Sequence, residues 1–583
     1  MTPLFRVMPL LLAATALSSC ATGLGLEEEA TSPYGAFLAA RYAGVNRDAQ
    51  GAAIYYAEAL DRLPGNAVLT DRAFITAVIA GEMSEASDLA AETVAAGDPS
   101  RLATLYLAAD EIAGRRYRRA VDVLDASPDF GPFNAFVGDM LSHWALLGAG
   151  RADEAVARAD ETVAPGFLAP HFWLHKAMLL DAAGRVEAAD EAYRSAVFAT
   201  TFPRLATELY GEFLERNGRR DAARALYETQ LINDPDEASI LAALARVETG
   251  ARAPRPRSIP ELAARSVLGP SASLAANADM DLTVIYLRMV QRLDPAYPPT
   301  RMTLGETLQR INLPEAALRE YEAVGEGPFR LAAEVDRIWL LGRLSRIEDA
   351  TNLARQLVAE TGDYEARLIL ADLLRVQGGC SEAAGVYRAV IESKRAAGLP
   401  DDWRYHYYRA ACLVETGNWP DAEAEYLAAL ELAPDESRIL NDLGYLWIER
   451  GEHTDRAVAM IQDAARLDPD DGNVIDSLGW AHYQLGQYET AVLELERATE
   501  LDPGNVAANL HLGDAYWQVG RRLEAGFQWR RALDLEPRDE QRMALEYRLE
   551  YGRPPVHEPL MADNSGVETE ADLRTADGEA GEP

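Results

Sequence analysis

The last third of the chain repeats itself with a period of 34 residues, and this period constrains the fold more than any other feature. Four prolines lie 35, 34 and 34 residues apart: Pro434, Pro469, Pro503 and Pro537. A proline ends a helix because it lacks an N–H and clashes with the preceding turn. Alanines and Leu-Gly pairs keep the same step, and such small residues let two helix axes approach to about 8–10 Å. The pattern therefore predicts antiparallel helix pairs stacked in series.

The clearest unit begins at Leu512 and Gly513, continues through Tyr516 and Trp529, and ends at Pro537. Its Leu-Gly-x-x-Tyr, Ala-x-x-x-Phe/Trp and Pro signature resembles the tetratricopeptide repeat (TPR). The resemblance implies an all-α TPR solenoid of about 13–14 helical hairpins that forms a right-handed superhelix. Solenoids of this kind bind protein partners on an extended surface.

Periodicity and composition divide the rest of the chain into segments. We expect N-terminal TPR-like repeats over 34–248, an irregular repeat over 249–296, C-terminal TPR repeats over 297–538, a capping helix over 539–553 and an acidic disordered tail over 554–583. The irregular repeat holds a basic, proline-rich loop that includes Arg252, Arg255 and Arg257. An insertion within a degenerate repeat is the favoured interpretation, because loops tolerate insertions. A hinge, or a contact for an acidic partner, is the alternative.

The first nineteen residues have the organisation of a lipoprotein signal peptide, with one charge, an apolar core and small residues before Cys20. Leu17-Ser18-Ser19-Cys20 resembles the bacterial lipobox, which implies a lipid on Cys20 and a lipidated tether over 20–33. In the lipoproteins that this sequence resembles, Asp after the cysteine favours retention in the inner membrane. The residue here is Ala21, so the resemblance implies the periplasmic face of the outer membrane. An ordinary signal peptide, or a hydrophobic N-terminus with a chance cysteine, is the alternative.

Charge and residue usage exclude several classes of function. The formal charge is −37, from 56 basic and 93 acidic residues, so the chain repels phosphate backbones and we expect no nucleic-acid partner. The chain has only two lysines, and neither follows the glycines of a phosphate-binding loop. Besides Cys20, Cys380 and Cys412 lie in neighbouring repeats, so a disulfide between them and two buried free thiols both remain open.

No catalytic motif is present in the sequence, and we expect a protein that is not an enzyme and that needs no cofactor or metal. The chain contains no G-x-S-x-G, G-x-G-x-x-G, H-E-x-x-H or paired C-x-x-C sequence. His171 and His175 lie one helical turn apart, but a zinc site needs further ligands and none is evident nearby. We therefore interpret them as surface or groove histidines of a repeat.

In TPR proteins, fixed positions of the first helix of each repeat line the binding face. Carried onto the regular repeats, these positions select a candidate peptide-binding groove: Arg404, Tyr407, Arg438, Asn441, Tyr445, Asp476, Trp480, Tyr483 and Trp517. Aromatic side chains beside hydrogen-bonding groups suit a peptide groove. The alternative is that some of these residues pack between neighbouring repeats. The Lys/Asn pattern of carboxylate clamps is absent.

The combination of signal and repeats resembles bacterial TPR lipoproteins of the outer membrane. The run from Asp442-Leu443-Gly444 to Asp514-Ala515-Tyr516 further resembles adaptors of periplasmic carboxy-terminal processing proteases, which deliver peptidoglycan hydrolases to the protease. The resemblance implies a non-enzymatic scaffold in the cell envelope that mediates protein–protein interaction. A scaffold lipoprotein for outer-membrane assembly or exopolysaccharide export is the alternative.

Overall fold

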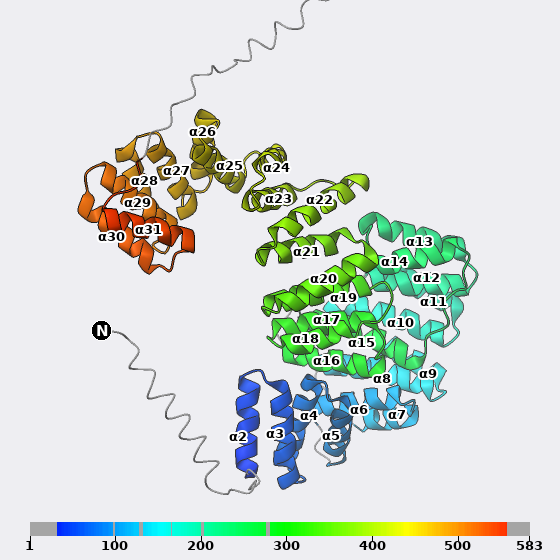
Figure 1. The fold of residues 1–583 in the computed structure, drawn as a ribbon. Coiled ribbons are helices and arrows are strands. Elements are labelled where there is room, and N and C mark those ends of the chain that lie inside the picture. Colours follow the sequence, from blue (N-terminus) through cyan, green and yellow to red (C-terminus); the bar gives the residue numbers. More distant parts are fainter. Residues whose placement is uncertain are drawn as a thin grey trace, which may run out of the picture. The chain divides into compact units, whose positions relative to one another are not determined.

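The computed structural model describes residues 32–96, 100–126, 132–164, 166–199, 203–275 and 280–556. Within these ranges the chain forms thirty α-helices and one short 3₁₀ helix, with no strand (Figure 1). The prediction of an all-α TPR-like repeat array is confirmed. The signal peptide, Cys20, most of the tether and nearly all of the acidic tail lie outside the described residues.

The chain divides into two compact units, and the boundary between them lies between Arg343 and Leu344. The helices of unit 1 are α2 (Pro33–Val45), α3 (Ala49–Arg62), α4 (Ala67–Ala80), α5 (Met83–Ala95), α6 (Arg101–Ala113), α7 (Tyr117–Asp125), α8 (Pro132–Gly148), α9 (Ala152–Glu161), η2 (Gly166–Leu168), α10 (Ala169–Ala182), α11 (Val186–Ala199), α12 (Pro203–Arg216), α13 (Arg220–Asn233), α14 (Ala238–Glu248), α15 (Ile259–Ala275), α16 (Met280–Leu293), α17 (Pro298–Arg310), α18 (Pro314–Glu322) and α19 (Arg330–Arg343).

Unit 2 continues the same alternation of first and second helices. Its helices are α20 (Ile347–Thr361), α21 (Tyr364–Val376), α22 (Cys380–Ala396), α23 (Trp403–Glu415), α24 (Trp419–Leu432), α25 (Ser437–Arg450), α26 (Thr454–Leu467), α27 (Gly472–Gln484), α28 (Tyr488–Leu501), α29 (Val506–Gln518), α30 (Arg522–Asp534) and α31 (Asp539–Tyr551). The expected helix after Pro537 is present as α31, which packs on α30 and α29.

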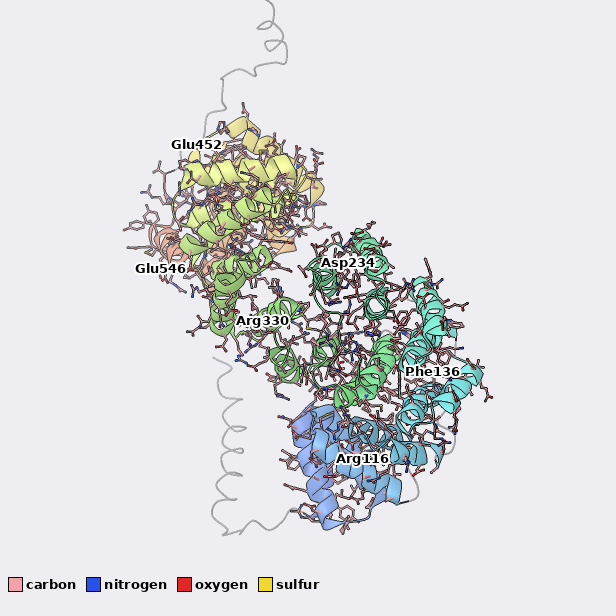
Figure 2. The ribbon with its side chains drawn as sticks, turned by 90° about the vertical axis from the view of Figure 1, so that its right-hand side faces the viewer. Arg116, Phe136, Asp234, Arg330, Glu452 and Glu546 are labelled. Carbon is pink, nitrogen blue, oxygen red and sulfur yellow. The ribbon has the colours of Figure 1, made fainter. Side chains whose placement is uncertain are left out.

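Local sequence signals set the ends of these helices. Asp471 and Asn505 cap α27 and α29, because their side chains accept hydrogen bonds from backbone N–H groups of the first turn. Gly486 and Gly520, in the turns that follow these helices, have φ of 73° and 84°, which suits glycine. Side chains also fill the space between neighbouring hairpins: Phe136 of α8, labelled in Figure 2, is buried, and its ring centroid lies 6.0 Å from that of Phe172 on α10. The helix caps and the turn glycines therefore recur with the 34-residue period, as the core residues do.

The glycine of each Leu-Gly pair lies where two helices come close. A methyl group added at Gly513 would lie 2.4 Å from Nε1 of Trp529 on the paired helix, whereas one at Gly526 of α30 would lie at an ordinary contact distance, 3.6 Å, from Nη2 of Arg530. We expect Gly513→Ala to destabilise unit 2 by about 1–3 kcal/mol through overpacking. The control Gly526→Ala should stabilise it by about 0.5–1 kcal/mol, because alanine favours the helix. Urea unfolding followed by circular dichroism tests this, and equal effects of the two substitutions would contradict it.

Unit 1 departs from a simple stack at α15 and α16. We call the surface formed by the first helices of the hairpins, α4, α6, α8, α10 and α12, the first-helix face of unit 1. The hairpin of α15 and α16 lies against this face, since α16 packs on α4 and α6 while α15 packs on α6, α8 and α10 (Figure 1). The expected insertion within a degenerate repeat is thus a helical hairpin that covers the inner face of its own stack.

The basic loop before α15 binds acidic residues of its own chain. Arg257 donates to Glu208 at 3.0 Å and to Glu212 at 2.5 Å on α12, and Arg255 pairs with Glu261 at 2.7 Å. Gly269 and Pro270, which the sequence places in an irregular region, lie inside α15. A methyl group at Gly269 would lie 2.5 Å from the ring of His171, so glycine permits the close approach of α15 to α10.

Candidate partner-binding surface

The nine predicted groove residues all lie on the first helices of four hairpins in unit 2, namely α23, α25, α27 and α29. We call the surface formed by α21, α23, α25, α27 and α29 the first-helix face of unit 2. Among the helices described in this unit, none packs across this face in the way that α15 and α16 cover the first-helix face of unit 1. At the end of the described stack, the capping helix α31 packs on α29. The first-helix face of unit 2 is therefore the open one.

Two arginines at the α23–α25 end of this face are exposed. Arg404 pairs with Asp402, Nη2 to Oδ2, at 2.6 Å, and Arg438 pairs with Glu436 at 2.8 Å. The guanidinium of Arg438 also lies over the ring of Trp403, 5.0 Å from its centroid. A guanidinium over an aromatic face keeps its charge available while the ring fixes its position. Each guanidinium keeps N–H groups outside these pairs that can donate to a carboxylate of a partner.

Half-buried aromatic residues continue the face along α23 and α25. The hydroxyl of Tyr407 donates to Oδ2 of Asp442 on the next first helix at 2.7 Å. Burial raises the pKa of Asp442, although the hydrogen bonds from Tyr407 and Asn441 lower it. Tyr445, half-buried on α25, follows one turn after Asn441. Tyr407 is thus held in place, and its ring edge and that of Tyr445 border the open face.

Trp480 of α27 is the centre of an aromatic stack. Its ring lies parallel to that of Tyr483, with centroids 4.8 Å apart and planes 6° apart, and it stacks on His511 of α29 at 4.1 Å. Its indole N–H donates to Glu449 of α25, and His511 Nδ1 contacts Asp476 at 2.9 Å. Burial disfavours a charged His511, but Asp476 outweighs it and raises the pKa of His511. A charged imidazole on an indole face strengthens the stack.

Three predicted groove residues do not line an open surface. Tyr483 is 2 % exposed and belongs to the core around Trp529 and Leu512. Asp476 and Asn441 are also buried between neighbouring first helices. For these three the groove assignment is wrong, and the alternative that they pack between repeats is the one the structure holds. The physical reason is the tight packing of the helices: a ring at position 483 lies in the core between neighbouring repeats and not on their surface.

Trp517 of α29 is half-buried and has a partner within the chain. Its indole Nε1 donates to the backbone oxygen of Gly552 at 3.1 Å, immediately after α31. The end of the capping helix therefore reaches this tryptophan. The candidate residues that are not buried are the exposed Arg404 and Arg438 and the half-buried Tyr407, Tyr445, Trp480 and Trp517.

The predicted groove positions do not include most of the polar partners that join one first helix to the next. Hydrogen bonds link Tyr407 to Asp442, His511 to Asp476, and Gln518 to Tyr483, all 35 residues apart in sequence, and Arg548 to Asp514, 34 apart. A donor and an acidic or phenolic acceptor separated by one repeat is the signal that could have revealed them. These bonds fix the spacing of the first helices and thereby the shape of the face.

The histidine pair of unit 1 is buried rather than at the surface. His175 Nε2 lies 3.0 Å from Nδ1 of His143 on α8, and its Nδ1 lies 3.0 Å from Oγ of Ser266 on α15. His171 Nε2 contacts Oγ of Ser273, also on α15, at 3.0 Å. The interpretation as surface or groove histidines is therefore wrong: they bind the α15–α16 hairpin to the first-helix face. Among the described residues, no group of three or more His, Cys, Asp or Glu could hold a metal.

Burial keeps these histidines neutral. It lowers the pKa of His143 and the pKa of His171 to about 4, and together with His143 it holds the pKa of His175 well below its usual value. The indole N–H of Trp144 donates to Oγ of Ser266 at 2.9 Å, so the hydroxyl of Ser266 is hydrogen-bonded to both Trp144 and His175. The contact between α8, α10 and α15 thus depends on uncharged imidazoles.

Cys380 and Cys412 are free thiols, and both are buried. Burial raises the pKa of each thiol, and the two thiols neighbour each other across α22 and α23. A buried, protonated thiol reacts slowly with oxidants. The structure therefore holds the reduced pair, the second of the two states left open by the sequence.

Sequence comparisons identify the repeats in the second half of the chain. Models of the tetratricopeptide repeat match residues 335–397, 370–437 and 413–472, and a TPR repeat model matches 479–520. The chain is similar to the TPR repeat-containing protein PA4667 of Pseudomonas aeruginosa, with 26% identity over 188 residues. This match covers 32% of the chain and spans 31%, about a third, of the length of that relative.

Solved structures give weaker likenesses. The Cut9–Hcn1 hetero-tetramer of the APC/C covers 91% of this chain and 98% of its own at 13% identity, with a TM-score of 0.35. A tetratricopeptide repeat protein from Parabacteroides merdae covers 44% of this chain and 98% of its own at 13% identity, with a TM-score of 0.36. At these scores they add no argument to the repeat assignment.

None of the helices in the described ranges has the length and apolar character needed to cross a bilayer. The helical hairpins in each unit, the 34-residue period and the matched residues agree with one another. Residues 335–472 and 479–520 are therefore similar to the tetratricopeptide repeat, and the described helices form a TPR-like array.

Proposed function

We propose that this protein is a non-enzymatic scaffold that holds a partner polypeptide on the first-helix face of unit 2. The observation that supports this most is the difference between the two units. In unit 1 the hairpin of α15 and α16 occupies the first-helix face, whereas in unit 2 no described helix does so. The open face presents accessible aromatic rings and two exposed arginines, which are the side chains that most often anchor a protein partner.

We further propose that the scaffold is a lipoprotein on the periplasmic face of the outer membrane, and that it links a carboxy-terminal processing protease to peptidoglycan hydrolases. The lipobox-like sequence before Cys20 and the resemblance of the C-terminal repeats support this role. A scaffold that binds protease and substrate together raises their effective concentration without any chemistry of its own. Affinity capture from the native cells identifies the partners: a synthase or export protein in place of a protease or hydrolase would contradict this assignment.

Substitution of the two half-buried tryptophans of this face, Trp480 and Trp517, tests the binding face. Trp480→Ala combined with Trp517→Ala is expected to remove the captured partner, since each buried aromatic anchor contributes about 2–4 kcal/mol to binding. The control, Leu493→Ala with Phe527→Ala, removes two exposed apolar side chains from second helices and should leave capture unchanged. Circular dichroism must show that the tryptophan variant keeps its helicity. A folded tryptophan variant that retrieves the wild-type partners would place binding elsewhere.

The lipid anchor has its own test. Cys20→Ala is expected to leave the protein uncleaved or to release it from the membrane fraction, because the acyl chains attach to this thiol and bury about 0.8 kcal/mol per CH₂ in the bilayer. Fractionation with radiolabelled palmitate measures both effects. A wild-type protein that stays soluble after export, with a free thiol on Cys20, would contradict the anchor.

A further inference from the structure

Helix α2 carries an exposed stripe that no described residue of unit 1 covers. Tyr34, Leu38, Tyr42 and Val45 are 76%, 63%, 74% and 79% exposed, although all four are large apolar or aromatic side chains. Their spacing of four, four and three residues puts them on one side of the helix. We call these four residues the α2 stripe. The opposite side of α2 buries Ala36, Ala40 and Ala43, and α3 is the element on which α2 packs (Figure 1).

The charge along α2 differs from that of the whole chain. Residues 33–47 contain Arg41 and Arg47 and no acidic residue, in a protein whose formal charge is −37. Arg41 lies within the stripe, one turn after Leu38, and it is exposed. It makes no ion pair with any described residue. An exposed apolar stripe with a cation inside it is the composition of a helix that lies at a membrane surface.

A cleft opens beside the stripe. It has a volume of about 420 Å³ and is lined by Arg41, Arg72 and apolar residues such as Ile75, together with Arg47 and Asp281, which form an ion pair at 3.0 Å. Arg72, like Arg41, has no ion-pair partner among the described residues. Arginines at the rim of an apolar cleft suit an anionic headgroup above an acyl chain.

The position of α2 in the sequence selects the occupant. Pro33, the first residue of α2, follows Cys20 by 13 residues, which span at most about 45 Å when fully extended. A lipid on Cys20 would therefore keep α2 close to the bilayer at all times. A helix held this close to the bilayer can add its own apolar and electrostatic contacts to the anchoring by the acyl chains.

We propose that the α2 stripe lies on the membrane surface to which the chain is tethered and binds its anionic lipids. The tyrosine rings and the two aliphatic side chains enter the lipid–water interface, and Arg41 contacts the headgroups. The rest of the acidic chain is repelled from such a surface, so the first repeat of unit 1 faces the membrane. This inference rests on the proposed lipid anchor, which brings α2 to the membrane.

Vesicle flotation of an unlipidated protein tests the stripe. The mature chain with Cys20→Ser, exported behind a cleavable non-lipoprotein signal, is mixed with phosphatidylethanolamine–phosphatidylglycerol vesicles or with phosphatidylcholine vesicles. We expect binding to the anionic vesicles that weakens with salt. The triple variant Tyr34→Ser, Leu38→Ser and Tyr42→Ser should bind about tenfold less. The control Phe198→Ser with Ile232→Ser removes two exposed apolar side chains of unit 1 outside α2 and should bind like the parent.

The outcomes separate this inference from the lipid anchor, because the flotation protein carries no lipid. An unlipidated chain that ignores anionic vesicles, or a triple variant that binds them as well as the parent, would overturn the membrane contact even if Cys20 is acylated in cells. A chain that instead forms dimers, and whose triple variant is monomeric by light scattering, would identify a second copy as the occupant. In the lipidated protein, a solvent-sensitive fluorophore at Leu38→Cys should shift to the blue on reconstitution, and one at Ile232→Cys should not.

Discussion

Arg548→Met is expected to destabilise the end of unit 2 by about 3–5 kcal/mol. Asp514 of α29 is 1 % exposed, and Arg548 of α31 donates to both of its oxygens, at 2.7 and 2.6 Å. The indole of Trp529 supplies one further hydrogen bond at 2.9 Å. Methionine would leave a buried carboxylate with that bond alone, and the cost of an uncompensated buried charge is large. Hydrogen exchange of α29 and α31 measures the local loss of stability.

Two companion variants show whether the pair is the cause. Asp514→Asn combined with Arg548→Met should recover most of the loss, because the amide oxygen still accepts from Trp529 and no charge remains buried. Arg542→Met, an exposed arginine on the same helix, should change stability by less than about 0.5 kcal/mol. A double variant no more stable than Arg548→Met alone would show that the capping helix loses stability for another reason.

Acidification from pH 7 to pH 5 is expected to weaken the contact between the α15–α16 hairpin and the first-helix face of unit 1. The pKa values of His143 and His171 are lowered to about 4 by burial, from an ordinary value of about 6.5. Below about pH 6.5 these histidines bind protons in the unfolded state but stay unprotonated in the folded state. The stability that these histidines contribute is therefore complete above pH 6.5 and is lost as the pH falls toward 4. Between pH 7 and 5 the loss is about 2 kcal/mol per histidine.

Hydrogen exchange of α8, α10 and α15 at both pH values, corrected for intrinsic rates, measures this loss. His171→Asn keeps a donor for Ser273 and should reduce the loss by about 2 kcal/mol, whereas the control His482→Gln in unit 2 should not alter it. Burial raises the pKa of Asp139 and of Glu212 in the same unit, which offsets part of the loss, so the comparison of variants isolates the histidine. Equal losses in His171→Asn and wild type would contradict the explanation.

Unit 2 should respond to pH in the opposite direction at His511. The pKa of His511 is raised, because Asp476 outweighs burial, so the charged ring is favoured in the folded state. Its contribution is present below about pH 6.5 and is lost as the pH rises through the raised value. The stack of Trp480 on His511 therefore tightens over the same acidification that loosens the α15 contact in unit 1.

The candidate face could be predicted in part. The residue offsets of the repeat located the helices that carry it, and Arg404 and Arg438 are exposed there as expected. The offsets could not distinguish aromatic rings that border the face from aromatic rings buried in the core beneath it. Trp480 and Tyr483 lie one turn apart on α27, yet the first is half-buried and the second is in the core. The difference is set by His511 and Gln518 of the following helix, which contact them from another repeat.

The sequence by itself determined the helices, their pairing and their close approach. These properties depend on residues within one 34-residue unit, such as the proline at Pro537 and the glycine at Gly513, whose effects are local in the chain. Only the tertiary structure decided which first-helix face stays open. The docking of α15 and α16 brings Ser266 to His175 across 91 residues, a contact that no repeat period contains. Hydrophobic burial is non-directional, so the apolar sides of α15 and α16 did not reveal in advance which helices they would cover.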